Sequence, residues 1–305
     1  MSYRLERCPA CEATTQRDVG VARDRHYGIQ GEYRVAQCDS CELVFLNPMY
    51  EDSELARFYP QDYYAYQDHS RELSPALRFV HQMLGFQDGT KDPIFERPGK
   101  VLDIGCGSGW FLSKRGSEGW QTCGVEISEA AARLGAEQAG LNIFRGTLLE
   151  AGFPADSFDY VRLNHSFEHI SCPNETLREI YRILRPGGSV LIAVPNYSSL
   201  NARMFGRYWF YLGIPVHAFS YSANNLSRLL TRSGLEVRSV IHNSNYAGIL
   251  GSFQIWLNRN NGKRSTEGFF INAVSLRVVS QWMAKIFDWF GQGDVIEAIA
   301  WKPLR

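Results

Sequence analysis

The stretch VLDIGCGSGWFL, residues 101–112, decides the fold of this chain of 305 residues. A run of apolar residues ends at the acid Asp103, and three alternating glycines follow at once, Gly105, Gly107 and Gly109. Because glycine has no side chain, such a loop lets the backbone approach a ligand closely. The apolar run predicts a buried strand, and the sequence from Trp110 predicts a helix directly after the loop.

Strand-like and helix-like segments alternate from Lys100 onward. Ser128 is predicted to be the N-cap of a helix that ends near Ala139. This alternation predicts an α/β fold, in which a mostly parallel sheet carries helices on both faces. Ligands of such sheets bind outside the carboxyl ends of the strands, where Asp103 and the glycines lie. The expected strands are 101–104, 121–126, 142–145, 158–163, 189–195, 235–241 and a last one, placed at an edge of the sheet, within 294–303.

Three kinds of nucleoside site compete for the glycine loop. A phosphate-binding P-loop needs Lys and then Ser or Thr, whereas this loop continues into Trp110 and Phe111. A dinucleotide site prefers the spacing G-x-G-x-x-G, which G-x-G-x-G does not match. S-adenosylmethionine remains, since Asp103 suits its ammonium group and Glu126 suits its ribose hydroxyls.

Together with GVEIS (124–128), FDYVRLNHSFEHI (158–170) and LRPGGSVLIAVPN (184–196), the glycine loop resembles the class I S-adenosylmethionine-dependent methyltransferase family. The resemblance covers roughly residues 98–240 and the last strand. It implies a Rossmann-like, seven-stranded, mostly parallel sheet with an antiparallel hairpin edge. It also implies a methyl-transferring enzyme that uses S-adenosylmethionine.

The resemblance assigns cofactor contacts to particular residues. Glu126 would hold the ribose, Ile127 and Leu148 would enclose the adenine, and Asn164 would contact the methionine part through its backbone. Thr147 stands where many members have an acid that reaches the adenine amino group, so we expect its hydroxyl to accept that hydrogen bond. The methionine end would be lined by Asp103, Gly105, Cys106, Gly107 and Gly109.

Two C-x-x-C pairs lie in the first 50 residues, in CPACE and CDSCE. Their spacing is typical of a tetrahedral zinc site, and four protein ligands predict a structural ion. We therefore expect a zinc-binding module at 1–50, a tyrosine-rich lead-in that caps the substrate at 51–99, and the catalytic domain at 100–305. This layout resembles bacterial zinc-binding methyltransferases of sugars and natural products. The expected ligands are Cys8, Cys11, Cys38 and Cys41.

Methyl transfer to a hydroxyl or a carbon needs a base, and histidine is the usual one because its pKa lies near neutral pH. His165, Glu168 and His169 follow the strand at 158–163, and His217 follows the next strand. All four are candidates, although Glu168 and His169 could instead hold their loop by hydrogen bonds. The expected walls of the substrate pocket are Tyr63, Tyr64 and Tyr66.

The composition of the chain limits the kinds of substrate and partner that we expect. With 32 basic and 32 acidic side chains the net charge is zero, which disfavours a nucleic-acid substrate. The sequence has neither a signal-peptide pattern nor a membrane span, so we expect a cytoplasmic protein. The apolar insert at 245–293 is interpreted as a helical lid, or alternatively as a segment (271–290) that touches the inner membrane face. The expected acceptor is a sugar-type small molecule; the alternatives are RNA, a lipid-linked substrate, or a scaffold without catalysis.

Overall fold

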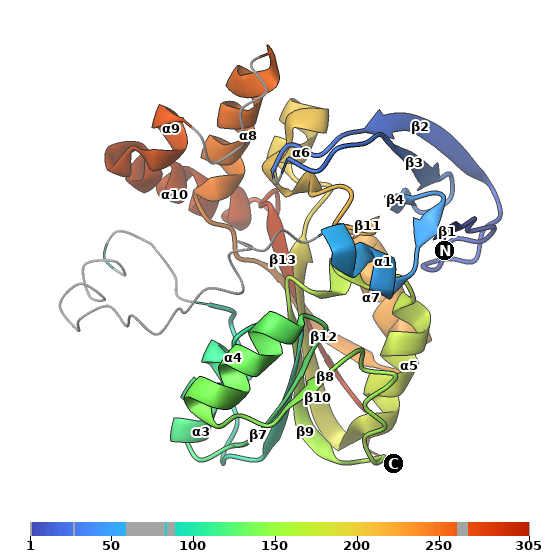
Figure 1. Ribbon diagram of the computed structural model, residues 1–305, viewed down its shortest axis with the longest axis vertical. Helices are drawn as coiled ribbons and strands as arrows, with labels where there is room; N and C mark the ends of the chain where they lie inside the picture. Colours follow the sequence, from blue (N-terminus) through green and yellow to red (C-terminus); the bar gives the residue numbers. More distant parts are fainter. Residues whose placement is uncertain (1, 27, 59–82, 84–88, 261–267, 305) are drawn as a thin grey trace.

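The computed structural model describes residues 2–26, 28–58, 83, 89–260 and 268–304. Its centre is a seven-stranded sheet in the order β12-β13-β10-β9-β6-β7-β8 (Figure 1). The strands β8, β7, β6, β9 and β10 run parallel to one another. In chain order the strands are β6 (Lys100–Ile104), β7 (Gln121–Glu126), β8 (Ile143–Arg145), β9 (Phe158–Asn164), β10 (Leu184–Pro195), β12 (Glu236–His242) and β13 (Val295–Trp301).

Helices cover both faces of this sheet, as the alternation predicts. The helices α3 (Trp110–Ser117) and α4 (Glu129–Ala139) lie on one face, and α5 (Pro173–Ile183) and α7 (Ala223–Arg232) lie on the other (Figure 1). Ser128 is the N-cap of α4, where its side chain accepts a hydrogen bond from the Ala131 N–H. The predicted α/β fold is therefore confirmed.

The last strand lies elsewhere than the sequence suggested. β13 was expected at an edge, but it lies between β10 and β12 and runs antiparallel to both. Every side chain from Val295 to Ala300 is buried except that of Ile299. The edge is formed by β12, whose side chains are at most half-buried. A strand that is apolar on both faces belongs inside a sheet, and the burial pattern of β13 follows that rule.

The first 50 residues add a second sheet in the order β11-β4-β3-β2. Its strands β2 (Gln16–Ala22), β3 (Tyr33–Cys38) and β4 (Val44–Leu46) come from this region, but β11 (Phe219–Ser220) comes from the catalytic part. Phe219 pairs with Phe45, and both side chains are buried in a core that continues under the large sheet. A short ladder of β1 (Ser2–Tyr3) with β5 (Met49–Tyr50) completes this region, and the helix α1 (Asp52–Leu55) follows it directly.

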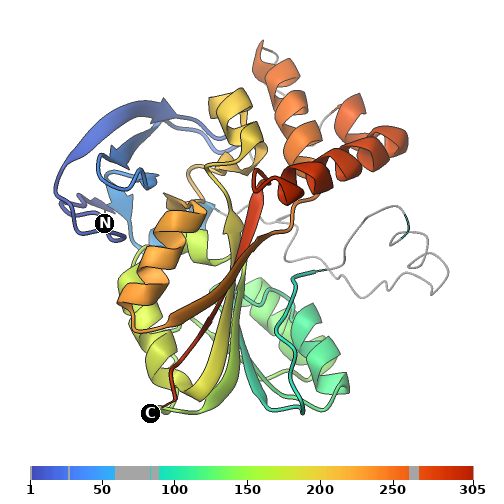
Figure 2. The ribbon, with the colours of Figure 1, turned by 180° about the vertical axis from the view of Figure 1, so that it is seen from behind.

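The insert at 245–293 is helical, as expected. It forms α8 (Ala247–Leu257), α9 (Phe269–Asn272) and α10 (Val274–Trp289), which project beyond the carboxyl ends of the strands (Figure 2). The helix α6 (Leu200–Phe205) packs beside α8. No helix among the described residues combines the length and the apolar character that crossing a bilayer requires.

Candidate functional site

A cavity of about 310 Å³ opens at the carboxyl ends of β6, β7 and β9. Of the ten residues predicted to contact the cofactor, only Gly109 is missing from its lining. Gly109 is the N-cap of α3, where its left-handed backbone (φ 81°) leads into the helix. The predicted residues that line the cavity are Asp103, Gly105, Cys106, Gly107, Glu126, Ile127, Thr147, Leu148 and Asn164.

Glu126 fixes the glycine loop against the end of β7. Its carboxylate accepts hydrogen bonds from the backbone N–H of Gly107 (2.9 Å) and of Ser128 (2.8 Å). Burial raises the pKa of Glu126, an effect that these backbone donors oppose. The side chain is nearly buried yet lines the cavity, so its remaining lone pairs can accept from a ligand hydroxyl.

Asp103 has a partner that sequence reasoning missed. Its Oδ1 and Oδ2 atoms accept from Arg162 Nη1 at 3.1 and 3.3 Å, and both side chains are buried. The Arg162 guanidinium also lies over the Phe111 ring, 4.1 Å from its centroid. Burial raises the pKa of Asp103, and the nearby guanidinium opposes that rise. The available signal was a cation in the middle of the apolar strand FDYVRLN, since such a charge needs a buried counter-ion.

Thr147 is hydrogen-bonded to a nearby acid, Glu150. Its backbone N–H and its hydroxyl both donate to Glu150 Oε2, at 2.7 and 2.8 Å, and these two bonds lower the pKa of Glu150. A hydroxyl that donates to a carboxylate keeps its lone pairs for a second partner. Thr147 can therefore accept from a ligand amino group, as expected from its position.

His165 is the histidine best placed toward the cavity. It lines the cavity, its side chain is 27% exposed, and its backbone adopts a φ of 53°, which is uncommon for a residue with a side chain. Its Nδ1 lies 3.3 Å from Glu168 Oε1. If Nδ1–H donates to this carboxylate, the Nε2 lone pair remains as an acceptor, which is the arrangement of a general base.

Glu168 is 1% exposed and lies beneath His165 in the 3-10 helix η3 (Phe167–His169). Burial alone would raise its pKa, but the hydrogen bond from His165 and the nearby rings of His169 and His217 lower it to about 2. Glu168 therefore stays ionised at neutral pH and orients His165 without lining the cavity itself.

The other two histidines differ in their contacts. His169 lines the cavity, and its ring nitrogens lie 2.9 Å from Val216 O and 3.1 Å from His165 O. His217 lies behind it and does not line the cavity. Its Nδ1 lies 3.0 Å from Tyr211 O, and burial lowers its pKa to about 3.

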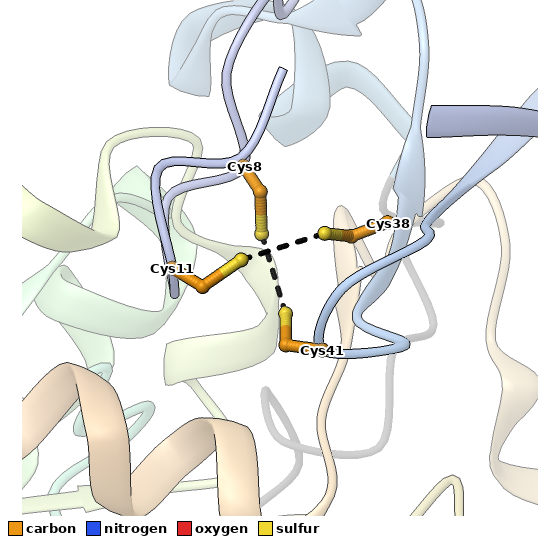
Figure 3. Close-up of side chains that lie close together, drawn as sticks. All are labelled: Cys8, Cys11, Cys38 and Cys41. Atoms are coloured by element: carbon orange, nitrogen blue, oxygen red, sulfur yellow. Dashed lines mark hydrogen bonds between the residues drawn. The ribbon is translucent and has the colours of Figure 1, made fainter. Parts of the chain in front are cut away.

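The four N-terminal cysteines converge on one point (Figure 3). The Sγ atoms of Cys8 and Cys41 are 3.5 Å apart, as are those of Cys11 and Cys38, which is too long for a disulfide. Both C-x-x-C pairs form the same turn. Glu12 and Glu42 have φ values of 62° and 61°, and their backbone N–H groups donate to Cys8 O and Cys38 O. A tetrahedron with metal–sulfur bonds of about 2.3 Å has edges of about 3.8 Å, so these thiols fit a zinc ion.

The far half of the cavity comes from residues that the sequence reasoning did not select. They belong to α1, to the turn after η3 and to α5, and apart from Ile170, the last residue of FDYVRLNHSFEHI, they lie outside the quoted motifs. Tyr63, Tyr64 and Tyr66 lie outside the described residues. Among the described residues, none between 245 and 293 lines the cavity. The unselected lining includes Asp52, Leu55, Ile170, Cys172 and Thr176.

Comparison with known proteins agrees with this geometry. A family model described as a methyltransferase domain matches residues 68–240, which is more than half of the chain. Demethylmenaquinone methyltransferase of Lysinibacillus sphaericus is 25% identical over 142 residues, covering 44% of this chain and 61% of that protein. Ubiquinone biosynthesis O-methyltransferase of Idiomarina loihiensis is 30% identical over 135 residues, covering 42% and 55%. The chain thus spans little more than half the length of these relatives.

Among solved structures, a chain in a complex of the Haloferax volcanii Trm112 methyltransferase activator with a methyltransferase matches the fold. The TM-score is 0.51 at 19% identity, covering 74% of this chain and 89% of that one. Strand order, glycine loop and acid at the end of β7 define an α/β protein of the Rossmann-like class. The chain belongs to the methyltransferase-domain family, and the resemblance to class I methyltransferases is confirmed.

Proposed function

We propose that this chain transfers a methyl group from S-adenosylmethionine to a hydroxyl or carbon of a small acceptor. One observation supports this most strongly: Asp103, the glycine loop and Glu126 line the same cavity as His165. S-adenosylmethionine supplies a methyl group already activated by the sulfonium. Glu126 would hold the ribose and Asp103 would face the ammonium group, directly or through water.

Within this proposal His165 accepts the proton of the acceptor. Glu168 holds its Nδ1 side, and the ring lies parallel to Tyr211 at a centroid distance of 6.3 Å, so two contacts fix its orientation. His169 and His217 were also proposed as bases. The contacts of His169 with two carbonyl oxygens suit a positioning role. The position of His217, which is partly exposed but does not line the cavity, suits the same role.

We propose that the acceptor is a sugar-type molecule and that the four cysteines hold a structural zinc ion. We also propose that the chain is divided into a zinc module (1–50), a lead-in (51–99) and a catalytic domain (100–305). The support for the acceptor is the resemblance in layout to sugar and natural-product methyltransferases. The support for zinc is the distance between the thiols and their position in two matching turns. The helix α1, which follows the proposed zinc module directly along the chain, contributes Asp52 and Leu55 to the cavity lining.

The test is a screen of a metabolite pool with methyl-labelled S-adenosylmethionine, followed by identification of the labelled product. With that product as the assay, His165→Gln should slow the chemical step by roughly 100-fold, the usual contribution of a general base. His242→Gln changes a histidine on β12 outside the cavity lining and is the matched control. Equal rates for both variants would reject His165 as the base, and no labelled product would reject the activity.

A second candidate, a lipid-linked acceptor, is favoured by the surface of the insert. Helix α10 buries Ser280, Gln281 and Ala284, whereas its opposite side exposes large apolar side chains. Contiguous apolar surface of this kind is rare on a soluble monomer and is typical of an interfacial helix. We call these residues the apolar face of α10: Val279 (56% exposed), Trp282 (53%), Met283 (40%), Ile286 (51%), Trp289 (85%) and Phe290 (69%).

Sedimentation with vesicles that contain anionic lipid tests this candidate. A charge at the centre of the apolar face, Ile286→Glu, should lower the vesicle-bound fraction, with a roughly tenfold weaker partition coefficient, or about 1.4 kcal/mol. Ile94→Glu, at a residue that is 97% exposed elsewhere on the chain, is the control and should bind like the wild type. Recovery of the wild type in the supernatant would reject membrane contact and leave the sugar-type acceptor in solution.

A further inference from the structure

A second group of metal-ligating side chains lies beside the cavity, far along the chain from the four cysteines. One ligand atom each from Glu168, His169 and His217 lies within 4.8 Å of the other two. Glu168 and His169 come from η3 after β9, and His217 comes from the loop before β11. The two segments are joined by the hydrogen bond from Ala218 N–H to Glu168 O (2.8 Å).

The carboxylate at the centre of this group has an unused oxygen. Glu168 Oε1 accepts from His165, whereas Glu168 Oε2 is buried and has no hydrogen-bond partner in the part of the chain that the structure describes. A buried oxygen without a partner costs about 1–3 kcal/mol, and more when it is charged. Natural sites avoid this cost by supplying a donor or a cation.

Of the two histidines, His217 has the contact that is typical of a metal-bound imidazole. A ligating histidine normally donates its other ring N–H to a carbonyl or carboxylate, which fixes the ring and leaves a lone pair for the ion. His217 Nδ1 faces Tyr211 O at 3.0 Å, which leaves Nε2 with the lone pair. Both ring nitrogens of His169 face carbonyl oxygens, so His169 must give up one of these hydrogen bonds, with its proton, to bind an ion.

We propose that Glu168, His169 and His217 form a binding site for a divalent first-row metal ion, separate from the four cysteines. Two imidazoles and one carboxylate suit such ions and leave coordination positions open. Since His165 and His169 line the cavity, the open positions would face the acceptor half of the site. A role of this ion in methyl transfer rests on the proposed function, but its binding does not.

The test is a titration with Co²⁺ of the protein after it has been loaded with zinc, followed by calorimetry and visible absorption. About one equivalent should bind and give only the weak bands of nitrogen and oxygen ligation. Cobalt that replaced zinc on the cysteines would instead give intense thiolate charge-transfer bands and release zinc, which elemental analysis detects. Binding should weaken at least about tenfold in Glu168→Gln and in His217→Phe, both close in volume to the native side chain.

His242→Phe is the matched control, because it removes a histidine outside the group, and it should bind cobalt like the wild type. Circular dichroism confirms that each variant is folded. Absence of cobalt uptake by the folded wild type would overturn the proposal and would mean that a proton shared by Glu168 and the histidines balances the charge. Unchanged affinity in both folded ligand variants would overturn it as well. A separate titration with S-adenosylmethionine keeps this result distinct from failure of the proposed function.

Discussion

Replacement of Arg162 by methionine should strongly destabilise the protein, although Arg162 is not part of any sequence motif. The change leaves the Asp103 carboxylate, 2% exposed, without the guanidinium that lies 3.1 Å away. At an effective dielectric constant of about 20, two unit charges at that distance interact by about 5 kcal/mol. Removal of one partner of a buried pair typically costs about 3–5 kcal/mol, so we expect a loss of that size in the free energy of unfolding.

The assay is urea unfolding at neutral pH, followed by circular dichroism. Arg185→Met is the control, because its ion pair with Asp159 (2.8 Å) is half-exposed and should contribute less than about 1 kcal/mol. The double variant Asp103→Asn/Arg162→Met removes both charges and should be more stable than Arg162→Met alone. The reasoning is refuted if Arg162→Met costs no more than the control, or if the double variant is no more stable than Arg162→Met.

Three further changes have defined outcomes. Gly109→Ala should lower the free energy of unfolding by about 1–3 kcal/mol, because the residue has a φ of 81° and a new Cβ would lie 2.2 Å from Leu141 Cδ1. The control Gly116→Ala, in open space within α3, should raise it by about 0.5–1 kcal/mol, and thermal unfolding measures both. Glu126→Gln should weaken S-adenosylmethionine binding in calorimetry by about tenfold or more, whereas the exposed Glu129→Gln should not. Asp294→Asn should lower the free energy of unfolding in urea by about 1–3 kcal/mol, because the carboxylate accepts hydrogen bonds from Ser199, Asn201 and Trp209 at 2.6–2.8 Å. Wild-type stability of this variant would contradict a stabilising role of these three hydrogen bonds.

Features encoded locally were predictable from the sequence. The strand before the glycine loop, the N-cap Ser128 and the acids at the ends of β6 and β7 depend on neighbours within a few residues. Parallel strands then place their carboxyl ends at one edge of the sheet, which brings Asp103, Glu126 and Asn164 to the same cavity without further information.

Features that depend on distant pairing were not predictable in this way. The place of β13 between β10 and β12 depends on three segments that are 40 or more residues apart along the chain. The partner of Asp103 depends on the register of β6 against β9, in which Asp103 lies directly opposite Arg162. The depth of His217 behind the cavity depends on its packing against η3, which local sequence does not encode.

The strand β11 pairs with the N-terminal sheet although it comes from the catalytic part of the chain, and this has a consequence for synthesis on the ribosome. The cysteine-containing sheet uses Phe219 and Ser220 as its outermost strand, although its other strands end at Leu46. Until residue 220 of 305 has left the exit tunnel, β4 is an open edge that another nascent chain could pair with. This sheet is thus translated well before the strand that closes it, and it is exposed to misassembly throughout that interval.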